Sequence, residues 1–308
     1  MKTHIIILVL SFFCSNFTQA NEYWKKDYAK IDAYAKTVKP TADINQLTLK
    51  LTEKYATDLE KYRSIFTWIA HNIAYDYNAL KNPSQAVVEP VKVLRSKKTI
   101  CEGYTGLFRK MCELANLECT TIIGWSHIKE NIGKNLGNIP NHAWNAIKLK
   151  NKWYLCDVTW GAGSIYEGTT GFTFEFNDAY FCTPPELFSF NHFPEQKEWL
   201  LGVELSKEKF SNRPHFYPLT VKMNTRNLAP ENGTLTYKKG DVIKFKFNAD
   251  IDVKQILANP SGANKSPIIN FTQQNSEVKF DYTFDTYKPY LYIYINNQSV
   301  LFYKVKKT

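Results

Sequence analysis

Three residues that can do chemistry together appear in order in the middle of the chain: Cys101, His142 and Asp157. A thiolate is a strong nucleophile, and an imidazole can take and return its proton. A carboxylate can hold the imidazole in one tautomer and stabilise the imidazolium. The three residue types therefore indicate covalent acyl transfer through a thioester.

The thiol stands at the start of a predicted helix. Apolar side chains follow it at helical spacing: Tyr104, Leu107, Phe108, Met111 and Ala115. A helix N-terminus presents free N–H groups and the positive end of the dipole, and both favour a thiolate at Cys101. The neighbouring Glu102 opposes that effect, so activation of the thiol needs a histidine partner.

The imidazole and the carboxylate lie on a predicted hairpin. Residues 142–149 and 153–159 have strand patterns, with Lys150-Asn151 central in the turn. If Leu149 pairs with Lys152, Asp157 lies on the same face as His142 and diagonal to it, about 7–8 Å away. A loop with an odd number of residues would put Asp157 on the opposite face. The predicted site therefore depends on the register of this hairpin.

The motifs around these residues resemble a known family. Cys101-Glu102-Gly103-Tyr104, His142-Ala143-Trp144-Asn145 and Asp157-Val158-Thr159-Trp160 are similar to the signature blocks of the transglutaminase-like superfamily of papain-like folds. Residues 64–69, 73–76 and 180–194 extend the resemblance toward the kyphoscoliosis-peptidase-type branch. It covers roughly residues 58–200. It implies Cys101 as nucleophile, His142 as general base and acid, and Asp157 as the orienting carboxylate.

Further site candidates are less specific. Papain-like sites often place a Gln side chain in the oxyanion hole, and Gln85, 16 residues before Cys101, is the candidate. Trp144 and Trp160 flank the catalytic positions, where they would either line the substrate groove or pack within the hairpin. Cysteine and histidine spacing predicts no zinc site, and the proposed chemistry needs no cofactor.

Residues 1–20 have the pattern of a secretory signal: Lys2, an apolar core from Ile5 to Phe13, and cleavage after Ala20. The predicted location is secreted or periplasmic, with association with the cell envelope left open. Lipoprotein processing at Cys14 is an alternative that its preceding residues fit poorly. No other apolar run is long enough for a membrane-spanning helix.

Export would leave five cysteines, an odd number, and Cys101 is the natural free thiol. The remaining four would form two disulfides or stay buried thiols: Cys112, Cys119, Cys156 and Cys182. Buried thiols are favoured, because a domain of this size does not need covalent staples.

The chain of 308 residues predicts two domains after the signal. A helical segment at 21–57, with a helix over 22–38, precedes a catalytic domain at 58–204 that begins at the capping box of residues 57–60. Residues 205–308 alternate in short stretches and predict an antiparallel β-sandwich of immunoglobulin-like type. The predicted fold class is therefore α+β, a papain-like core followed by an all-β accessory domain.

These observations predict an exported cysteine-dependent hydrolase or acyl transferase that acts on peptide or amide bonds of a protein or peptide. Hydrolysis is favoured over cross-linking, because water is abundant and no amine-binding site is evident. The formal charge of +10 comes without a nucleic-acid motif, so a solvated basic surface is expected. The alternative is a non-catalytic binding module for a partner protein or a cell-envelope polymer.

Overall fold

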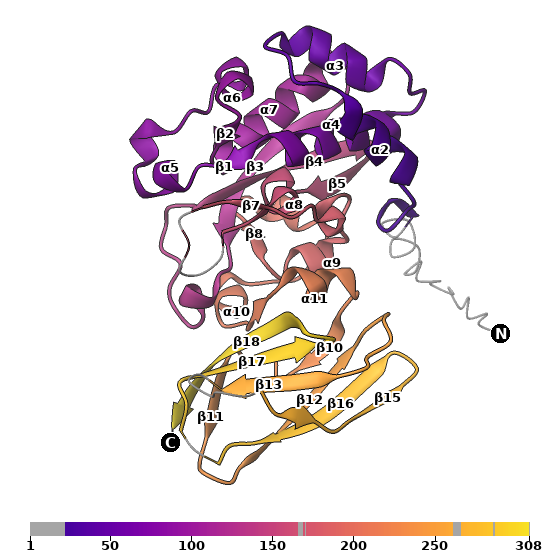
Figure 1. Ribbon diagram of the computed structural model, residues 1–308. Helices are drawn as coiled ribbons and strands as arrows, with labels where there is room; N and C mark the ends of the chain where they lie inside the picture. The colour runs from indigo at the N-terminus through magenta and orange to yellow at the C-terminus, as the bar shows by residue number, and fades with distance from the viewer. Residues whose placement is uncertain (1–21, 166–168, 170, 261–265, 286, 308) are drawn as a thin grey trace, which may run out of the picture.

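The computed structural model describes residues 22–165, 169, 171–260, 266–285 and 287–307. The predicted signal segment, with Cys14, lies outside the described residues. Figure 1 shows helices packed against a small sheet in the N-terminal part and a separate group of strands in the C-terminal part. The fold is mixed α+β, as predicted.

The longer helices precede the core sheet along the chain: α2 (Ala29–Thr37), α3 (Ile44–Thr52), α4 (Asp58–Asn72) and α7 (Cys101–Leu114). The predicted capping box is confirmed at α4, where Thr57 Oγ1 accepts from the Glu60 N–H and the Glu60 carboxylate accepts from the Thr57 N–H. It satisfies two of the N–H groups that a helix start leaves open.

The prediction of one helix over residues 22–38 is wrong in its first part. Lys25 has a left-handed backbone (φ 62°), and α2 begins only at Ala29. The indole of Trp24 instead packs beside a later segment and donates from Nε1 to the Ala179 carbonyl at 3.1 Å. Burial of a large aromatic against distant residues has overridden the local helical pattern.

Several short elements complete the N-terminal part: β1 (Ala74–Tyr75), α5 (Tyr77–Lys81), η1 (Pro83–Gln85), α6 (Pro90–Ser96), β2 (Lys98–Thr99), η2 (Lys129–Asn131), α8 (Val158–Ala162), β6 (Gly163–Ser164), β7 (Thr173–Phe174), η3 (Asp178–Tyr180), α9 (Pro185–Phe188), η4 (Lys197–Leu200), α10 (Lys207–Ser211) and α11 (Pro218–Lys222).

The core sheet has four antiparallel strands in the order β5-β4-β3-β8: β5 (Lys152–Cys156), β4 (His142–Leu149), β3 (Cys119–Ser126) and β8 (His192–Pro194). Leu149 pairs with Lys152 and Asn145 with Cys156, so the hairpin has the register on which the predicted site depends. Both loop residues, Lys150 and Asn151, have positive φ, as a type I′ turn requires.

The second strand of this hairpin is shorter than predicted. It ends at Cys156 and does not continue to Thr159, because Asp157 caps α8 with its side chain. Its Oδ1 accepts from the Trp160 N–H at 3.0 Å. An aspartate at this position favours a helix start over further strand.

One hydrophobic core joins α4, α7 and the sheet. The rings of Phe66 on α4 and Phe108 on α7 meet edge to face at 6.5 Å, and Ile147 of β4 belongs to the same fully buried cluster. Close packing of this kind makes the helix that carries Cys101 and the strand that carries His142 parts of one rigid body.

The C-terminal part contains two sheets, β10-β12-β16-β15 and β11-β18-β17-β13-β14, with β9 paired to β18. Its strands are β9 (His215–Phe216), β10 (Arg226–Ala229), β11 (Thr234–Tyr237), β12 (Val242–Asn248), β13 (Ile256–Pro260), β14 (Ile268–Ile269), β15 (Phe271–Gln274), β16 (Glu277–Thr283), β17 (Tyr290–Ile295) and β18 (Gln298–Lys307). All their pairings are antiparallel except β11 with β18, which is parallel.

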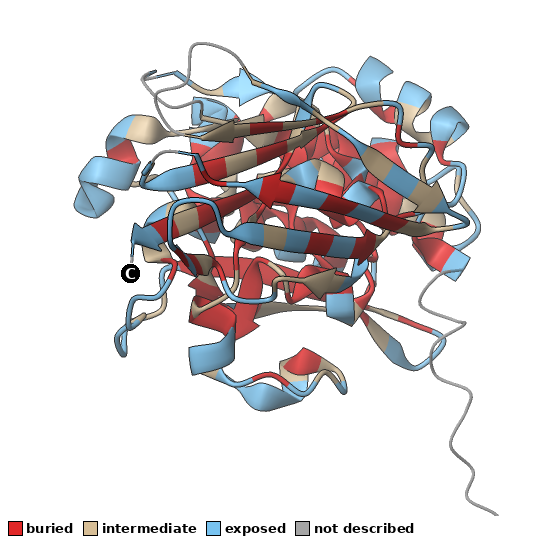
Figure 2. Ribbon diagram, turned by 90° about the horizontal axis from the view of Figure 1, so that it is seen from below, coloured by how far each residue is buried: buried red, intermediate tan, exposed pale blue. Residues whose placement is uncertain are grey.

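Buried and exposed residues alternate along these C-terminal strands (Figure 2), most regularly in β16. The inner faces of the two sheets share one core, in which Phe245 stacks on Phe280 at 4.8 Å and meets Tyr303 edge to face. The predicted group of short alternating strands is therefore confirmed.

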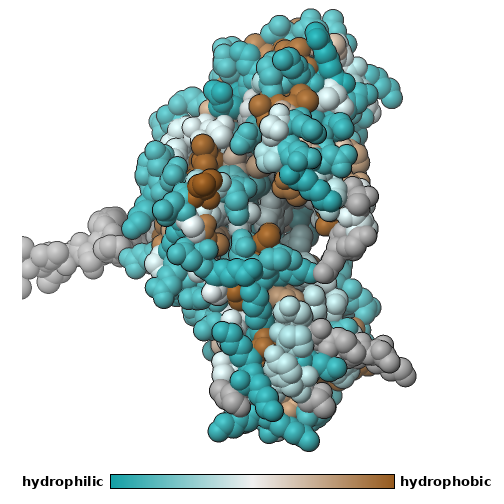
Figure 3. Space-filling view, turned by 90° about the vertical axis from the view of Figure 1, so that its left-hand side faces the viewer, coloured by the Kyte–Doolittle hydropathy of each residue, from teal (hydrophilic) through white to brown (hydrophobic). Residues whose placement is uncertain are grey.

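The face of the molecule in Figure 3 is predominantly hydrophilic, and hydrophobic side chains appear on it in small separate groups. Scattered apolar residues of this kind are normal on a protein surface. Among the residues that the structure describes, no helix has the length and apolar character needed to cross a membrane.

Candidate active site

Cys101 is the first residue of α7 and is 9% exposed. Thr99, the last residue of β2, packs against the first turn of this helix. Its hydroxyl donates to the Val87 carbonyl at 2.5 Å. A Cβ added at Gly103 would clash with the Thr99 side chain, so only glycine permits this close approach. The predicted placement of the thiol at a helix start is confirmed.

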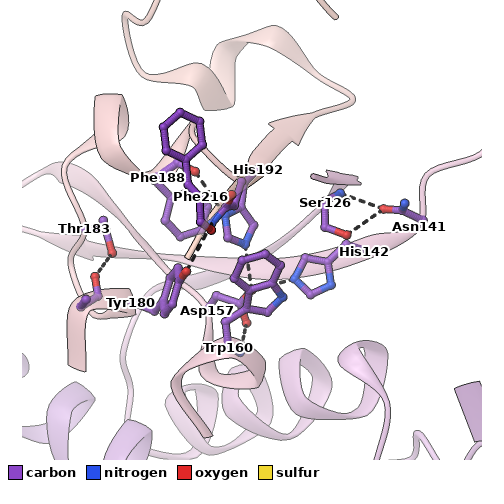
Figure 4. A network of polar contacts seen from close by, with 12 residues as sticks. Ser126, Asn141, His142, Asp157, Trp160, Tyr180, Thr183, Phe188, His192 and Phe216 are labelled. Atoms are coloured by element: carbon purple, nitrogen blue, oxygen red, sulfur yellow. Dashed lines mark hydrogen bonds and ion pairs between the residues drawn. The ribbon is translucent and has the colours of Figure 1, made fainter. Parts of the chain in front are cut away.

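His142 is the first residue of β4 and lies opposite Gly124 of β3. The loop that leads into it closes just before the histidine, because Asn141 Oδ1 accepts from the Ser126 N–H at 2.7 Å (Figure 4). The Asn141 N–H also donates to the Gly124 carbonyl at 3.0 Å. These bonds fix the backbone from which the imidazole projects.

The imidazole and the carboxylate meet directly. His142 Nε2 lies 2.6 Å from Asp157 Oδ2 (Figure 4), a short hydrogen bond between two buried side chains. The Asp157 N–H donates to the Tyr180 carbonyl at 2.9 Å, so both the main chain and the side chain of the aspartate are held. The structure thus brings together the two residues that the hairpin pattern predicted to be neighbours.

Electrostatics around this pair favour the charged forms. Burial alone lowers the pKa of His142, but the Asp157 charge and hydrogen bond outweigh it, and together with Cys101 they raise the pKa to about 10. Burial raises the pKa of Asp157, but His142 and His192 outweigh it and hold the pKa well below its usual range. An imidazolium beside a carboxylate is therefore the favoured state at neutral pH.

Cys101 also reaches this pair. The side chain of Cys101 lies near enough to His142 to contribute to the raised pKa of the imidazole. Because Nε2 of the imidazole is occupied by Asp157, Nδ1 is the ring nitrogen left for the thiol. The thiol and the carboxylate thus act on the same imidazole, and both raise its pKa.

Asn145 ties the segments of the site to one another. Its side-chain amide lies on the strand of His142 and donates to the Thr105 carbonyl on the helix of Cys101 at 3.3 Å. It also donates to the Thr120 carbonyl of β3 at 3.2 Å. This fully buried amide links the helix of the thiol to the strand of the imidazole.

A second histidine that the sequence did not identify as a site residue completes the cluster. His192 Nε2 lies 2.9 Å from Asp157 Oδ2, the same oxygen that contacts His142 (Figure 4). The signal available in the sequence was its position in the closing segment, Asn191-His192-Phe193-Pro194, which resembles the family.

His142, Asp157 and His192 are the one group of potential metal ligands of this kind within the described ranges. Their nitrogen–oxygen separations of 2.6 and 2.9 Å are hydrogen-bond distances. Two ligands at about 2.0 Å from a tetrahedral zinc ion would stand about 3.3 Å apart. The geometry fits shared protons better than a shared metal ion.

The remaining candidates differ in position. Gln85 ends η1 with an exposed side chain, and its oxyanion role stays a prediction. Trp144 is 1% exposed and packs among Ile122, Leu155 and Phe188, which favours packing over groove lining. Trp160 is half-buried, with its ring 5.9 Å from that of His142, and its groove role stays a prediction.

All five cysteines of the described chain are free thiols: Cys101, Cys112, Cys119, Cys156 and Cys182. Cys112, Cys156 and Cys182 are buried, as the favoured alternative predicted, whereas Cys119 is half-buried. Burial raises the pKa of Cys156 and Cys182, so these two stay protonated and unreactive.

Comparison with known proteins identifies the family. Residues 45–158 match the Transglutaminase-like superfamily. This part of the chain belongs to that superfamily. The matched segment contains Cys101, His142 and Asp157.

Two curated relatives extend the match. The chain is 39% identical over 220 residues to kyphoscoliosis peptidase of Homo sapiens, which covers 68% of this chain and 33% of the relative. It is 29% identical over 189 residues to Hillarin of Drosophila melanogaster, covering 54% of this chain and 22% of the relative. The chain thus spans a third or less of these relatives.

A solved structure described as a TGase covers 46% of this chain and 34% of its own, at 15% identity. Its TM-score of 0.30 is too low to support an argument from superposition. The transglutaminase-like identity therefore comes from the sequence matches.

Proposed function

We propose that this protein is an exported cysteine hydrolase that cleaves peptide or amide bonds through a thioester on Cys101. The observation that carries the proposal is the 2.6 Å bond between His142 and Asp157. Cys101 is among the groups that raise the pKa of the same imidazole. The curated relative named a peptidase supports the class of reaction. The proposal also includes a catalytic domain at residues 58–204 and a C-terminal domain of immunoglobulin-like type at residues 205–308.

The mechanism begins from a Cys101 thiolate beside the His142 imidazolium, the ion pair in which the thiol proton already lies on the imidazole. The thiolate attacks the carbonyl carbon of the substrate, and a carbon–sulfur bond forms as the carbonyl electrons move to oxygen. When the tetrahedral intermediate collapses, the carbon–nitrogen bond breaks and the His142 imidazolium gives its proton to the leaving amine. The product of this half-reaction is a thioester and a free amine.

The second half-reaction returns the enzyme. His142, now neutral, takes a proton from water, and the hydroxide adds to the thioester carbonyl. The carbon–sulfur bond breaks, the thiolate leaves, and a carboxylic acid is released. Asp157 remains ionised throughout and orients the imidazole. An amine in place of the water would give cross-linking by the same steps, but the described residues provide no evident amine site.

The test is the pH dependence of iodoacetamide alkylation at Cys101, read by mass spectrometry in the wild type and in His142→Ala. Fast labelling well below pH 8 that is lost in His142→Ala is expected, because the imidazolium stabilises the thiolate. Cys119→Ala, at a half-buried thiol on β3 that is not one of the predicted site residues, serves as the control and keeps wild-type labelling at Cys101.

A second arm tests the reaction. Peptide substrates found by screening should be cleaved by the wild type and not by Cys101→Ala. Cleavage that survives Cys101→Ala would refute the thioester mechanism. An ordinary thiol pH profile in the wild type, with no cleavage of any screened peptide, would favour the binding module.

A further inference from the structure

His192 is buried in an aromatic cage directly beside the proposed catalytic pair. Its side chain is wholly buried, and its ring stacks on Phe188 at 3.9 Å and meets Trp144 edge to face at 5.1 Å. The ring of Trp160 lies 4.9 Å away. A polar ring in such apolar surroundings loses its contact with water, so the bonds made by its two nitrogens determine its role.

Both ring nitrogens of His192 face acceptors. Nε2 lies 2.9 Å from Asp157 Oδ2, and Nδ1 lies 3.2 Å from the Phe188 carbonyl. A carbonyl oxygen and a carboxylate can only accept, and a neutral imidazole has one N–H. A neutral ring can therefore donate to one of these oxygens and not to both.

At neutral pH the ring is neutral, because burial, which is the largest influence, lowers the pKa of His192 from its ordinary value of 6.5. The single proton belongs on Nε2, since the contact to Asp157 is shorter and its acceptor is charged. In this tautomer the Asp157 carboxylate receives three N–H groups, from the Trp160 main chain at Oδ1 and from the two imidazoles at Oδ2.

We propose that His192 is a positioning residue, which donates from Nε2 to Asp157 and so keeps this buried carboxylate ionised and aligned for His142. The inference rests on the proposed function. His192 acts through Asp157 and does not touch the reacting atoms. A carboxylate that is wholly buried needs donors on its lone pairs, and His192 supplies one without adding a second positive charge beside His142.

The fold delivers His192 to this place through β8. This strand pairs with β3 on the side opposite β4, with His192 across from Ser126. On the other side of β3, His142 lies across from Gly124, and the two imidazole rings stand 5.4 Å apart. Asp157 approaches both from the end of β5.

Other titratable groups near the carboxylate stay neutral in acid. The neighbours whose pKa is influenced by Asp157 are, besides the two histidines, Tyr75, Tyr104, Cys156 and Tyr180, and burial raises the pKa of all four. The acid limb of Cys101 reactivity is therefore set by Cys101, His142 and Asp157, and through Asp157 by His192.

The experiment compares three substitutions at position 192 in the full chain. His192→Phe keeps an aromatic ring and removes both donors. His192→Gln keeps an amide N–H near the place of Nε2, and His192→Asn keeps one near the place of Nδ1. The readout is the acid limb of iodoacetamide alkylation at Cys101, with thermal unfolding of each variant to confirm that it is folded.

We expect the acid limb in His192→Phe to move toward neutral pH by roughly one to two units, which corresponds to the loss of one hydrogen bond to a buried charge. His192→Gln should restore most of the shift, and His192→Asn should not. Rescue by Asn and not by Gln would identify a structural bond to Phe188 and overturn the proposal. A folded His192→Phe with an unchanged limb would also overturn it.

A measurement on the wild type covers the case in which the variants fail to fold. Selective ¹⁵N labelling of the histidines, with the His192 signals assigned in the wild type through the contacts of its ring with Phe188 and Trp160, reports which nitrogen of His192 carries the proton. Protonated Nε2 and bare Nδ1 are expected, and the reverse would refute the inference. A wild type that lacks reactivity below pH 8 would refute the proposed function, while the tautomer would still decide the role of His192.

Discussion

The two parts of the molecule place their polar groups differently. Among the described residues, those that are buried and also polar or charged all lie between Thr48 and Thr225. The C-terminal strands bury apolar and aromatic side chains, and their ion pairs are exposed, as in Arg226 with Asp250. A buried polar group lowers the stability of the fold unless it is hydrogen-bonded. The buried polar residues of the N-terminal part therefore need partners in fixed positions, and their bonds specify one arrangement of the side chains.

A second buried ion pair in the N-terminal part makes the same point. The Arg63 guanidinium is 1% exposed and binds Asp32 with two parallel bonds of 2.7 and 2.6 Å. Thr67 donates to the same carboxylate at 2.6 Å, and the guanidinium lies over the ring of Tyr28. This pair joins α2 to α4, the helix that packs against the helix of Cys101.

The largest expected effect is on the chemistry, in Asp157→Asn. The amide cannot stabilise an imidazolium and favours the wrong tautomer of His142, so kcat/KM for a cleaved peptide should fall on the order of 10³-fold or more. Asp178→Asn, at a half-exposed carboxylate in a weak ion pair with Lys222, is the matched control and should retain activity. Equal kinetics in wild type and Asp157→Asn would remove Asp157 from the mechanism.

The second prediction contrasts a buried with an exposed ion pair. Arg63→Ala should lower the free energy of unfolding by about 3–5 kcal/mol, because it leaves the Asp32 carboxylate without its partner. Arg226→Ala breaks a pair whose side chains are about 40% exposed and should cost no more than about 1 kcal/mol. Urea unfolding of both variants measures the difference. Similar losses of unfolding free energy in the two variants would show that the buried ion pair contributes no more to stability than the exposed one.

The third prediction follows from the raised pKa of His142. Its pKa rises on folding from 6.5 to about 10, so its stabilising contribution is complete below pH 6.5 and is lost as the pH rises toward 10. Between these limits the wild type should lose about 2–4 kcal/mol of unfolding free energy relative to His142→Gln.

His71→Gln is the control for that comparison, since burial lowers the pKa of this half-buried histidine and it stays neutral above pH 7. Its unfolding free energy should follow the wild-type pH dependence. Parallel curves for wild type and His142→Gln would mean that the imidazolium is not stabilised in the folded protein.

Local patterns were sufficient for much of the fold. The helix at Cys101, the capping box at Thr57 and the hairpin register all depend on residues close in sequence. The C-terminal strands were predictable for a related reason, since their alternation directly reflects one buried and one solvated face. In the N-terminal part, buried positions also hold polar side chains, so alternation of apolar and polar residues does not predict which residues are buried there.

The failures have tertiary causes. The break before α2 arises because Trp24 is buried beside Ala179, far along the chain. His192 was missed as a site residue because only the pairing of β8 with β3 brings it to Asp157, 35 residues away. No periodicity in a single sequence reports such a contact.

The smallest expected effect tests how tightly the site is built into the N-terminal part. Gly103 and Gly106 both lie in α7, but a methyl group at Gly103 would clash with Thr99, whereas one at Gly106 would meet the Val88 carbonyl at an ordinary 3.6 Å. Gly103→Ala should therefore cost about 1–3 kcal/mol of unfolding free energy and slow alkylation of Cys101, because the first turn of the helix must shift. Gly106→Ala should be neutral or stabilise the protein by up to about 1 kcal/mol, since alanine is the better helix former.

Thermal unfolding and the labelling rate at pH 6 measure both effects. If Gly103→Ala kept the wild-type labelling rate, the position of the Cys101 thiol would not depend on the contact between Gly103 and Thr99. The bonds of Asn145 would then be what holds the helix of Cys101 against the strand of His142.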